Sequence, residues 1–209
     1  MHELDARKQA TSSEELMPEL KNRWSPRALS EKALEEWQLR ALFEAARWAA
    51  SSSNQQPWRF LVARREDTHY AALREGLMEG NDVWAHRAPV LLATLARKKR
   101  VGKDAPNPHA WHDLGLAMGN LCAQATHLGL YVHQMAGIYP EKVAENFGVD
   151  TKEFDVVSMA AIGHRDPDGI NLLHEGHAKA EIAPRERSPL EELVFARKVG
   201  EPAEWTQKK

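Results

Sequence analysis

The stretch PVLLATL, residues 89–95, is a nearly continuous apolar run that is followed by a basic segment, residues 97–100. Seven residues are too few for a lone helix. A strand that is covered on both faces accounts for apolar residues at successive positions. We therefore predict that residues 89–95 form a strand of a sheet that lies at the centre of the fold.

Helical and strand-like patterns alternate on both sides of this run. The strongest helical pattern is WHDLGLAMGNLCAQATHLGL, residues 111–130, and Gly129 is its expected end. Small residues recur every four positions within it, at Gly115, Gly119 and Ala123. Because small side chains let helix axes approach closely, we expect this helix to be an interface element.

The remaining patterns predict a layered α/β domain. A polar arm, residues 1–21, is expected to hold at most a short helix, and residues 22–209 form a single domain. Gly80 and Gly148 are the expected ends of two helices. The expected helices cover residues 30–50, 67–78 and 140–147, with a further helix start at Ser188, and the expected strands cover residues 59–63, 131–138 and 156–163.

Composition restricts the class of protein. The chain has 209 residues, of which 43% are hydrophobic, enough for one sizeable core. The formal net charge of −2 argues against a nucleic-acid partner and requires any bound anion to be held locally. The single cysteine, Cys122, excludes an intrachain disulfide and points to the cytoplasm. No apolar run approaches the length of a membrane span, so we expect no membrane association.

Several common catalytic signatures are absent. The sequence has no glycine-rich phosphate loop of standard spacing, no G-x-S-x-G and no H-E-x-x-H. The histidine pairs 109/112 and 174/177 lack a third metal ligand, so we interpret them as surface histidines. The basic residues 97–100, together with Lys103, are interpreted as a solvated loop. Cys122 is interpreted as a buried structural thiol.

Two groups of polar residues have no such ordinary explanation. The loop SSSNQQPW, residues 51–58, joins a helix to a strand with more hydrogen-bonding groups than a connection needs. Arginine pairs also precede helices near both ends of the chain, in NRWSPRAL (residues 22–29) and APRERSPL (residues 183–190). Guanidinium groups, hydroxyls and helix N-termini are the groups that bind a phosphate.

In these motifs the sequence resembles the FMN-dependent nitroreductases. Arg23-Trp24-Ser25-Pro26-Arg27 is similar to the Arg-x-Ser-x-Arg signature of that family, and residues 51–58 are similar to its Pro-Ser-Ser-x-Asn-x-Gln-Pro-Trp loop. Further matches follow in the same order: Gly80-Asn81, the APVLL strand, the glycine-rich helix, His133-Gln134-Met135-Ala136-Gly137 and Arg185-x-Arg187. The sequence departs from the family pattern at Ala50, Gln134 and Ala136, which leaves the subfamily and the substrate open.

The resemblance implies an α/β (α+β) layered domain, with a central mixed β-sheet flanked by helices, that forms a homodimer. It implies that the loop at residues 51–58 crosses the FMN of the partner subunit, and that the backbone near Met135 faces flavin N5. The implied cofactor-binding residues are Arg23, Trp24, Ser25, Arg27, Ser51, Ser52, Asn54, Gln56, Asn81, Gln134, Met135, Ala136, Gly137, Arg185 and Arg187. No residue is singled out as a catalytic acid or base.

The implied activity is an FMN-dependent oxidoreductase that takes hydride from NADPH or NADH and reduces a small acceptor, such as a nitroaromatic or a quinone, in a ping-pong cycle. Three alternatives remain open at this point: a family relative that performs dehalogenation or flavin breakdown, an FMN-binding protein without catalysis, and an unrelated α/β domain that binds no flavin.

Overall fold

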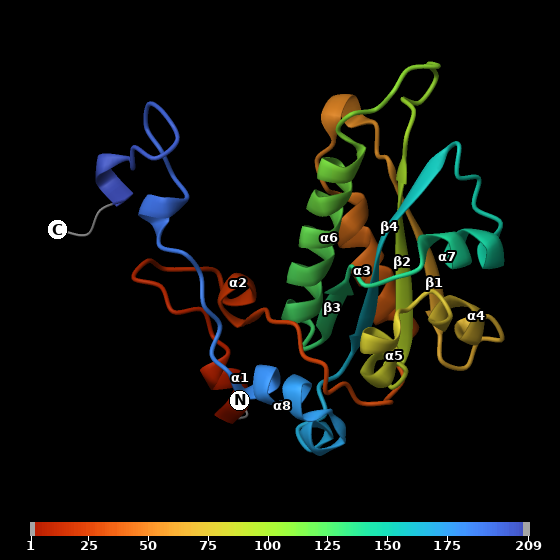
Figure 1. Ribbon diagram of the computed structural model, residues 1–209, viewed down its shortest axis with the longest axis horizontal. Coiled ribbons are helices and arrows are strands. Elements are labelled where there is room, and N and C mark those ends of the chain that lie inside the picture. Colours follow the sequence, from red (N-terminus) through yellow and green to blue (C-terminus); the bar gives the residue numbers. More distant parts are fainter. Residues whose placement is uncertain (1–2, 207–209) are drawn as a thin grey trace.

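A four-stranded antiparallel sheet forms the middle layer of the protein. The computed structural model describes residues 3–206. The strand order is β1-β2-β4-β3 (Figure 1). The strands are β1 (Trp58–Arg64), β2 (Val90–Arg97), β3 (Tyr131–Met135) and β4 (Phe154–Gly163). Seven of the eight residues of β2 are buried, which confirms the prediction of a strand that is covered on both faces.

The sheet is antiparallel at every pairing, so the expected mixed sheet is wrong. The helix α6 (Ala110–His127) connects β2 to β3, and these two strands both run antiparallel to β4. They therefore point in the same direction, as a strand-helix-strand connection requires. Because β4 occupies the position between them, no parallel pair is formed.

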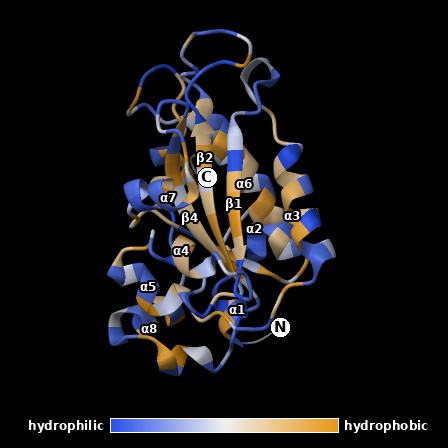
Figure 2. Ribbon diagram, turned by 90° about the vertical axis from the view of Figure 1, so that its right-hand side faces the viewer, coloured by the Kyte–Doolittle hydropathy of each residue, from blue (hydrophilic) through white to orange (hydrophobic). Residues whose placement is uncertain are grey.

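Helices cover both faces of the sheet. One layer holds α3 (Glu36–Arg47) and α6, which pack on each other (Figure 1). The opposite layer holds α4 (Tyr70–Arg74), α5 (Glu79–Ala85) and α7 (Pro140–Phe147). Figure 2 shows the sheet in mostly hydrophobic colours and hydrophilic residues on the surrounding helices and loops.

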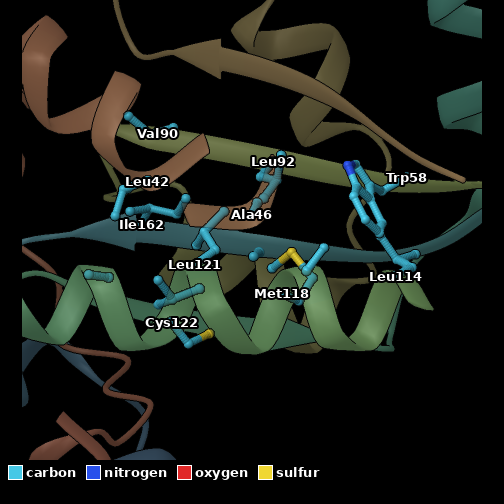
Figure 3. Packing of buried hydrophobic residues seen from close by; sticks show 14 of the residues in the cluster. Leu42, Ala46, Trp58, Val90, Leu92, Leu114, Met118, Leu121, Cys122 and Ile162 are labelled. Atoms are coloured by element: carbon cyan, nitrogen blue, oxygen red, sulfur yellow. The ribbon is translucent and has the colours of Figure 1, made fainter. Parts of the chain in front are cut away.

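The side-chain alternation of β2 divides the core into two clusters. Val90 and Leu92 point toward α3 and α6, whereas Leu91 and Ala93 point toward the opposite layer. Figure 3 shows Leu92 in the first cluster, together with Leu121 of α6. This arrangement is the reason that the sequence of the strand is apolar without interruption.

Three expected helices differ from the structure. The helix expected from residue 30 begins at Glu36, after a capping box of Glu35 and Gln38, and the N–H of Ser30 donates to the carbonyl of His164 at 2.9 Å. The helix expected over residues 67–78 covers only Tyr70–Arg74, and a separate helix begins at Glu79, so Gly80 lies inside that second helix instead of ending the first. The helix expected from Ser188 is only a single 3-10 turn, Leu190–Glu192.

Other boundaries agree closely with the sequence patterns. The helix α7 spans residues 140–147 as expected, and Gly148 ends it in a left-handed conformation with φ of 61°. The N-terminal arm, which was expected to hold at most one short helix, holds two, α1 (Glu3–Arg7) and α2 (Pro18–Asn22). Neither α5 nor α8 (Glu175–Ile182) was expected. Figure 1 shows the chain after α8 extending away from the sheet.

The close approach of Gly76 to α7 generates a stability prediction. A Cβ atom at this position would lie 2.3 Å from Val143 Cγ2, so Gly76→Ala would push α7 away from the turn that follows α4 within this layer. We expect it to lower the free energy of unfolding by about 1–3 kcal/mol, measured by urea denaturation. Gly80→Ala is the control, because nothing lies within 4 Å of its added Cβ atom. Equal stabilities of the two variants would contradict the prediction.

Candidate functional site

The loop at residues 51–56 has a strained backbone. Ser53, Asn54 and Gln56 have φ angles of 51°, 54° and 45°, in the left-handed region that residues other than glycine seldom adopt. Such conformations persist only where surrounding interactions hold them, and they are concentrated at functional sites. The strained backbone therefore makes this loop a candidate part of the functional site.

Hydrogen bonds hold this loop in place. The hydroxyl of Ser51 accepts the backbone N–H of Gln56 at 3.0 Å, and the carboxylate of Asp113 accepts the N–H of Ser52 at 3.0 Å. Gln55 accepts the N–H of Val101 through its side-chain oxygen at 2.6 Å. Asp113 is only 2% exposed and lies in the first turn of α6, so the loop is fixed to the start of that helix.

A second polar group is assembled from the two ends of the chain. The guanidinium of Arg23 donates to the hydroxyl of Ser25 at 3.2 Å. Arg185 donates to the carbonyl oxygen of Arg23 and, at 2.7 Å, to that of Lys21. Arg187 is exposed, and the hydrogen bond of its side chain goes to the adjacent carbonyl of Glu186. The structure thus brings Arg23, Ser25 and Arg185 together.

The positive charges in this group repel one another. Burial lowers the pKa of Arg185, and the charges of Arg23 and Arg187 lower it further. The pKa of Lys8 is lowered mainly by burial, with Arg185 and Arg27 acting in the same direction against the attraction of a carboxylate, Glu181. A group of cations in this state favours an anion as an additional partner.

Arg27 lies on aromatic side chains beside this group. Its guanidinium carbon is 5.9 Å from the ring centre of Trp84, and the ring of His133 lies 4.5 Å from the same indole. The Nε of Arg27 and the Nε1 of Trp84 are both buried without a hydrogen-bond partner. Unpartnered donors of this kind indicate a position where an acceptor belongs.

The end of β3 supplies the third part of the site. Gln134 and Ala136 are exposed, and Met135 between them is buried. Asn81 of α5 donates to the carbonyl of Gly137 at 2.8 Å. A Cβ atom at Gly137 would lie 2.9 Å from the amide nitrogen of Asn81, so this close contact requires glycine.

Two expected cofactor residues are internal. Trp24 is 4% exposed, its ring stacks edge-on against Tyr131 at 5.9 Å, and the ammonium of Lys8 lies 4.9 Å from its ring centre. Met135 belongs to the core cluster on the α4, α5 and α7 side. Both residues are next to polar members of the site and shape it through packing.

The two polar groups lie at different heights along α6 (Figure 1). The loop is attached at Asp113, whereas Gln134 donates to the thiol of Cys122 at 3.6 Å and the charge of Arg23 acts on the same thiol. Asp113 and Cys122 are nine residues apart, which is about 13 Å of helix at 1.5 Å per residue. One chain therefore does not bring all of the expected ligands together.

The remaining candidates have structural roles. Cys122 is buried, as expected, and burial raises the pKa of its thiol. Three cations of the basic segment are ion-paired: Arg97 with Glu153, Lys98 with Asp155 and Lys99 with Asp104. Within residues 3–206 no group of three or more histidine, cysteine, aspartate or glutamate side chains is arranged to hold a metal ion. Nor does any helix in that range combine the length and apolar character needed to cross a membrane.

Sequence reasoning missed two buried carboxylates, Asp113 and Glu181. Asp113 falls at a core-facing position of an otherwise apolar stripe, which is the one signal that could have identified it. Glu181 is 1% exposed, and it lies in α8, which no sequence pattern predicted. Both carboxylates accept backbone N–H groups of the expected cofactor-binding segments.

Comparisons with known proteins show which family and fold the chain resembles. The model of the nitroreductase family matches residues 20–83 and 72–164. A Mycolicibacterium smegmatis protein named "Uncharacterized 15.4 kDa protein in ask 5'region" is 30% identical over 154 residues, which cover 69% of this chain and 99% of that protein.

Solved structures are also similar. A crystal structure described as an oxidoreductase containing FMN is 32% identical, with a TM-score of 0.84 over 90% of this chain and 94% of that one. The FMN- and NADPH-dependent nitroreductase NfnB from Sphigopyxis sp. strain HMH is 17% identical, with a TM-score of 0.67 over 86% of this chain and 97% of that one. The second likeness concerns the fold alone.

The environment of His133 generates a prediction about pH. Burial and the charge of Arg27 lower the pKa of His133 to about 4, from 6.5 in an unfolded chain. As the pH falls from 6.5 to 4, His133 therefore binds a proton in the unfolded state but not in the folded state. We expect the free energy of unfolding to fall by about 3 kcal/mol across this window and then to level off below pH 4 as far as this group is concerned.

Urea denaturation at several pH values between 7.5 and 4 measures this loss. His133→Asn keeps a donor for the carbonyl of Pro26 but does not titrate, so its stability should depend less steeply on pH. His109→Asn is the control, because His109 is an exposed residue before α6. If His133→Asn retains the full pH dependence of the parent protein, the assignment to His133 is wrong.

Proposed function

This chain belongs to the nitroreductase family, and from that premise we propose that it is an FMN-dependent oxidoreductase that uses NADPH or NADH to reduce small acceptors such as nitroaromatics or quinones. The observation that carries the proposal is the group of arginines at Arg23, Arg27 and Arg185. Charges within this group help to lower the pKa of Arg185 and of Lys8. The Nε atoms of Arg27 and Arg185 are buried without a hydrogen-bond partner. A phosphate and an electron-rich ring edge are acceptors that complement such a group.

The residues fit the cofactor in three sets. The phosphate would be held by Arg23, Ser25, Arg185 and Arg187. Arg185 also donates to two backbone carbonyls, so it would hold the neighbouring segments in place as well as supply positive charge. Arg27 and Asn81 would hold the polar edge of the flavin ring. The exposed chain at Gln134, Ala136 and Gly137 would face the reactive side of the ring.

Bound FMN would supply the redox chemistry, taking a hydride equivalent from the nicotinamide and passing electrons to the acceptor. The side chains supply position and charge. His133 is neutral near pH 7 because burial and Arg27 lower its pKa to about 4, and it is hydrogen-bonded to the carbonyl of Pro26. We therefore assign it no role as an acid, and no other side chain is proposed as a proton donor.

A homodimer would unite the two polar groups. The loop residues Ser51, Ser52, Asn54 and Gln56 are attached at the start of α6, away from the arginines. We propose that they bind the cofactor of the partner subunit. The exposed face of α6 supports this, since it presents the apolar side chains of Trp111 and Leu116 beside Gly115 and Gly119, at which nothing lies within 4 Å of an added Cβ atom.

The dimer proposal predicts the effect of Gly119→Leu. Within one chain the larger side chain meets open space, so the fold should survive. At a close helix interface it should separate the subunits and release FMN. Size-exclusion chromatography with light scattering, together with the flavin absorption spectrum, measures both effects.

Glu145→Leu is the control for this experiment, because it places the same side chain at an exposed position of α7, on the opposite layer. A parent protein that is fully loaded with FMN as a stable monomer would refute the shared site.

Bleaching of the flavin by NADPH or NADH, followed by recovery with an acceptor, tests catalysis. An FMN-loaded protein that fails to bleach would instead be a binding protein.

The phosphate proposal predicts weaker cofactor binding by Arg23→Ala and Arg187→Ala. Loss of a hydrogen bond to a charged partner costs about 1.5–3 kcal/mol, which corresponds to about a 10- to 100-fold rise in Kd. Because both residues would hold one phosphate, the double variant should deviate from additivity. Titration of FMN into the apoproteins measures the cycle, with the exposed Lys142→Ala as control. Parental affinity in both single variants would identify these arginines as solvated surface groups.

A further inference from the structure

Glu181 is a buried carboxylate whose position needs an explanation. It lies in the last turn of α8 and is 1% exposed, whereas Glu175 on the same helix has a side chain that is 83% exposed. Burial of a carboxylate is costly unless hydrogen bonds and an opposite charge compensate for it. Its partners therefore indicate why it is there.

The hydrogen bonds of Glu181 go to the backbone of the arginine segment. The N–H of Arg27 lies 3.2 and 3.0 Å from the two carboxylate oxygens, and the N–H of Ala28 lies 3.2 Å from one of them. These two residues belong to no helix, and Ala28 is buried. Without Glu181 their N–H groups would lose their acceptor.

Lys8 supplies the opposite charge. Its ammonium group is buried, is attracted by Glu181 and donates to the carbonyl oxygens of Ala180 and Ala183, at the C-terminal end of α8. Cations are favourable at this end of a helix. Figure 1 shows α1 and α8 side by side, so the N-terminal arm meets the segment at residues 175–183 at this pair.

The segment that Glu181 holds carries the guanidinium with an unpartnered nitrogen. Arg27 directly follows Pro26, whose carbonyl is bound to His133, and its side chain lies over Trp84. Fixing the backbone on both sides of this peptide bond fixes the point and the direction from which the Arg27 side chain leaves the chain, and from there its guanidinium lies over Trp84.

We propose that Glu181 is a positioning residue for the cofactor site: its buried carboxylate fixes the backbone of Arg27 and Ala28, and so holds the Arg27 guanidinium where it binds the ring edge of the flavin. The inference rests on the proposed function, since it gives Glu181 a task at that same site. Glu181 acts through Arg27 and does not itself touch the cofactor.

The test is a set of FMN titrations into apoprotein of the parent, Glu181→Ala, Glu181→Gln, Arg27→Ala and the double variant Glu181→Ala/Arg27→Ala. We expect Glu181→Ala to raise Kd about tenfold and Glu181→Gln, which keeps one carbonyl acceptor, about threefold. The double variant should bind FMN no more weakly than Arg27→Ala alone. Glu175→Gln, on the exposed side of the same helix, is the matched control.

A second measurement does not depend on FMN. The charge of Arg27 helps to lower the pKa of His133, so displacement of Arg27 in Glu181→Gln should raise that pKa, as followed by NMR of the apoprotein. Parental FMN affinity in the Glu181 variants, or full additivity with Arg27→Ala, would overturn the proposal. If the parent itself binds no FMN, the proposed function fails, and an unchanged His133 pKa then overturns the positioning role as well.

Discussion

The segments proposed to bind the cofactor depend on one constraint: a backbone N–H that is shielded from water and has no partner in its own segment must find an acceptor elsewhere. Asp113 satisfies it for the strained loop, and Glu181 satisfies it for the arginine segment. Each carboxylate lies on a helix and reaches a loop that is distant in sequence. Attachment to a helix thus restricts the conformations of loops that would otherwise adopt many.

The helix α6 decides how far apart these two segments lie. The helix α6 connects β2 to β3, and β4 lies between these two strands in the sheet. One segment is attached at the first turn of this helix and the other lies beside its second half. The separation of the two polar groups therefore follows from the length of α6, since each group lies beside a different part of that helix.

Sequence patterns predicted the parts of the fold that depend on local chemistry. The buried strand β2 and the helix α7 with its glycine end follow from apolar runs and capping residues, and both were found as expected. The mixed sheet that the resemblance implied is wrong for this chain, and the pattern of strands and helices could not correct it, because it does not record which strand lies between β2 and β3. The helix expected from Ser30 begins instead after the capping box of Glu35 and Gln38, which the apolar spacing did not distinguish from the earlier start.

The candidate site shows the same division. The arginines, the polar loop and Gly137 could be identified by residue type, because each has a chemistry that ordinary structure does not need. Glu181 could not, since α8 has no apolar periodicity and a glutamate in a polar helix is ordinarily solvated. Glu181 is buried because the N-terminal arm packs against α8, where the charge of Lys8 compensates that of Glu181. Arg185, which follows α8, donates to the carbonyls of residues 21 and 23. A chain of nearly neutral overall charge can therefore concentrate cations in one place, because Glu181 attracts Lys8 and backbone carbonyls bind Arg185.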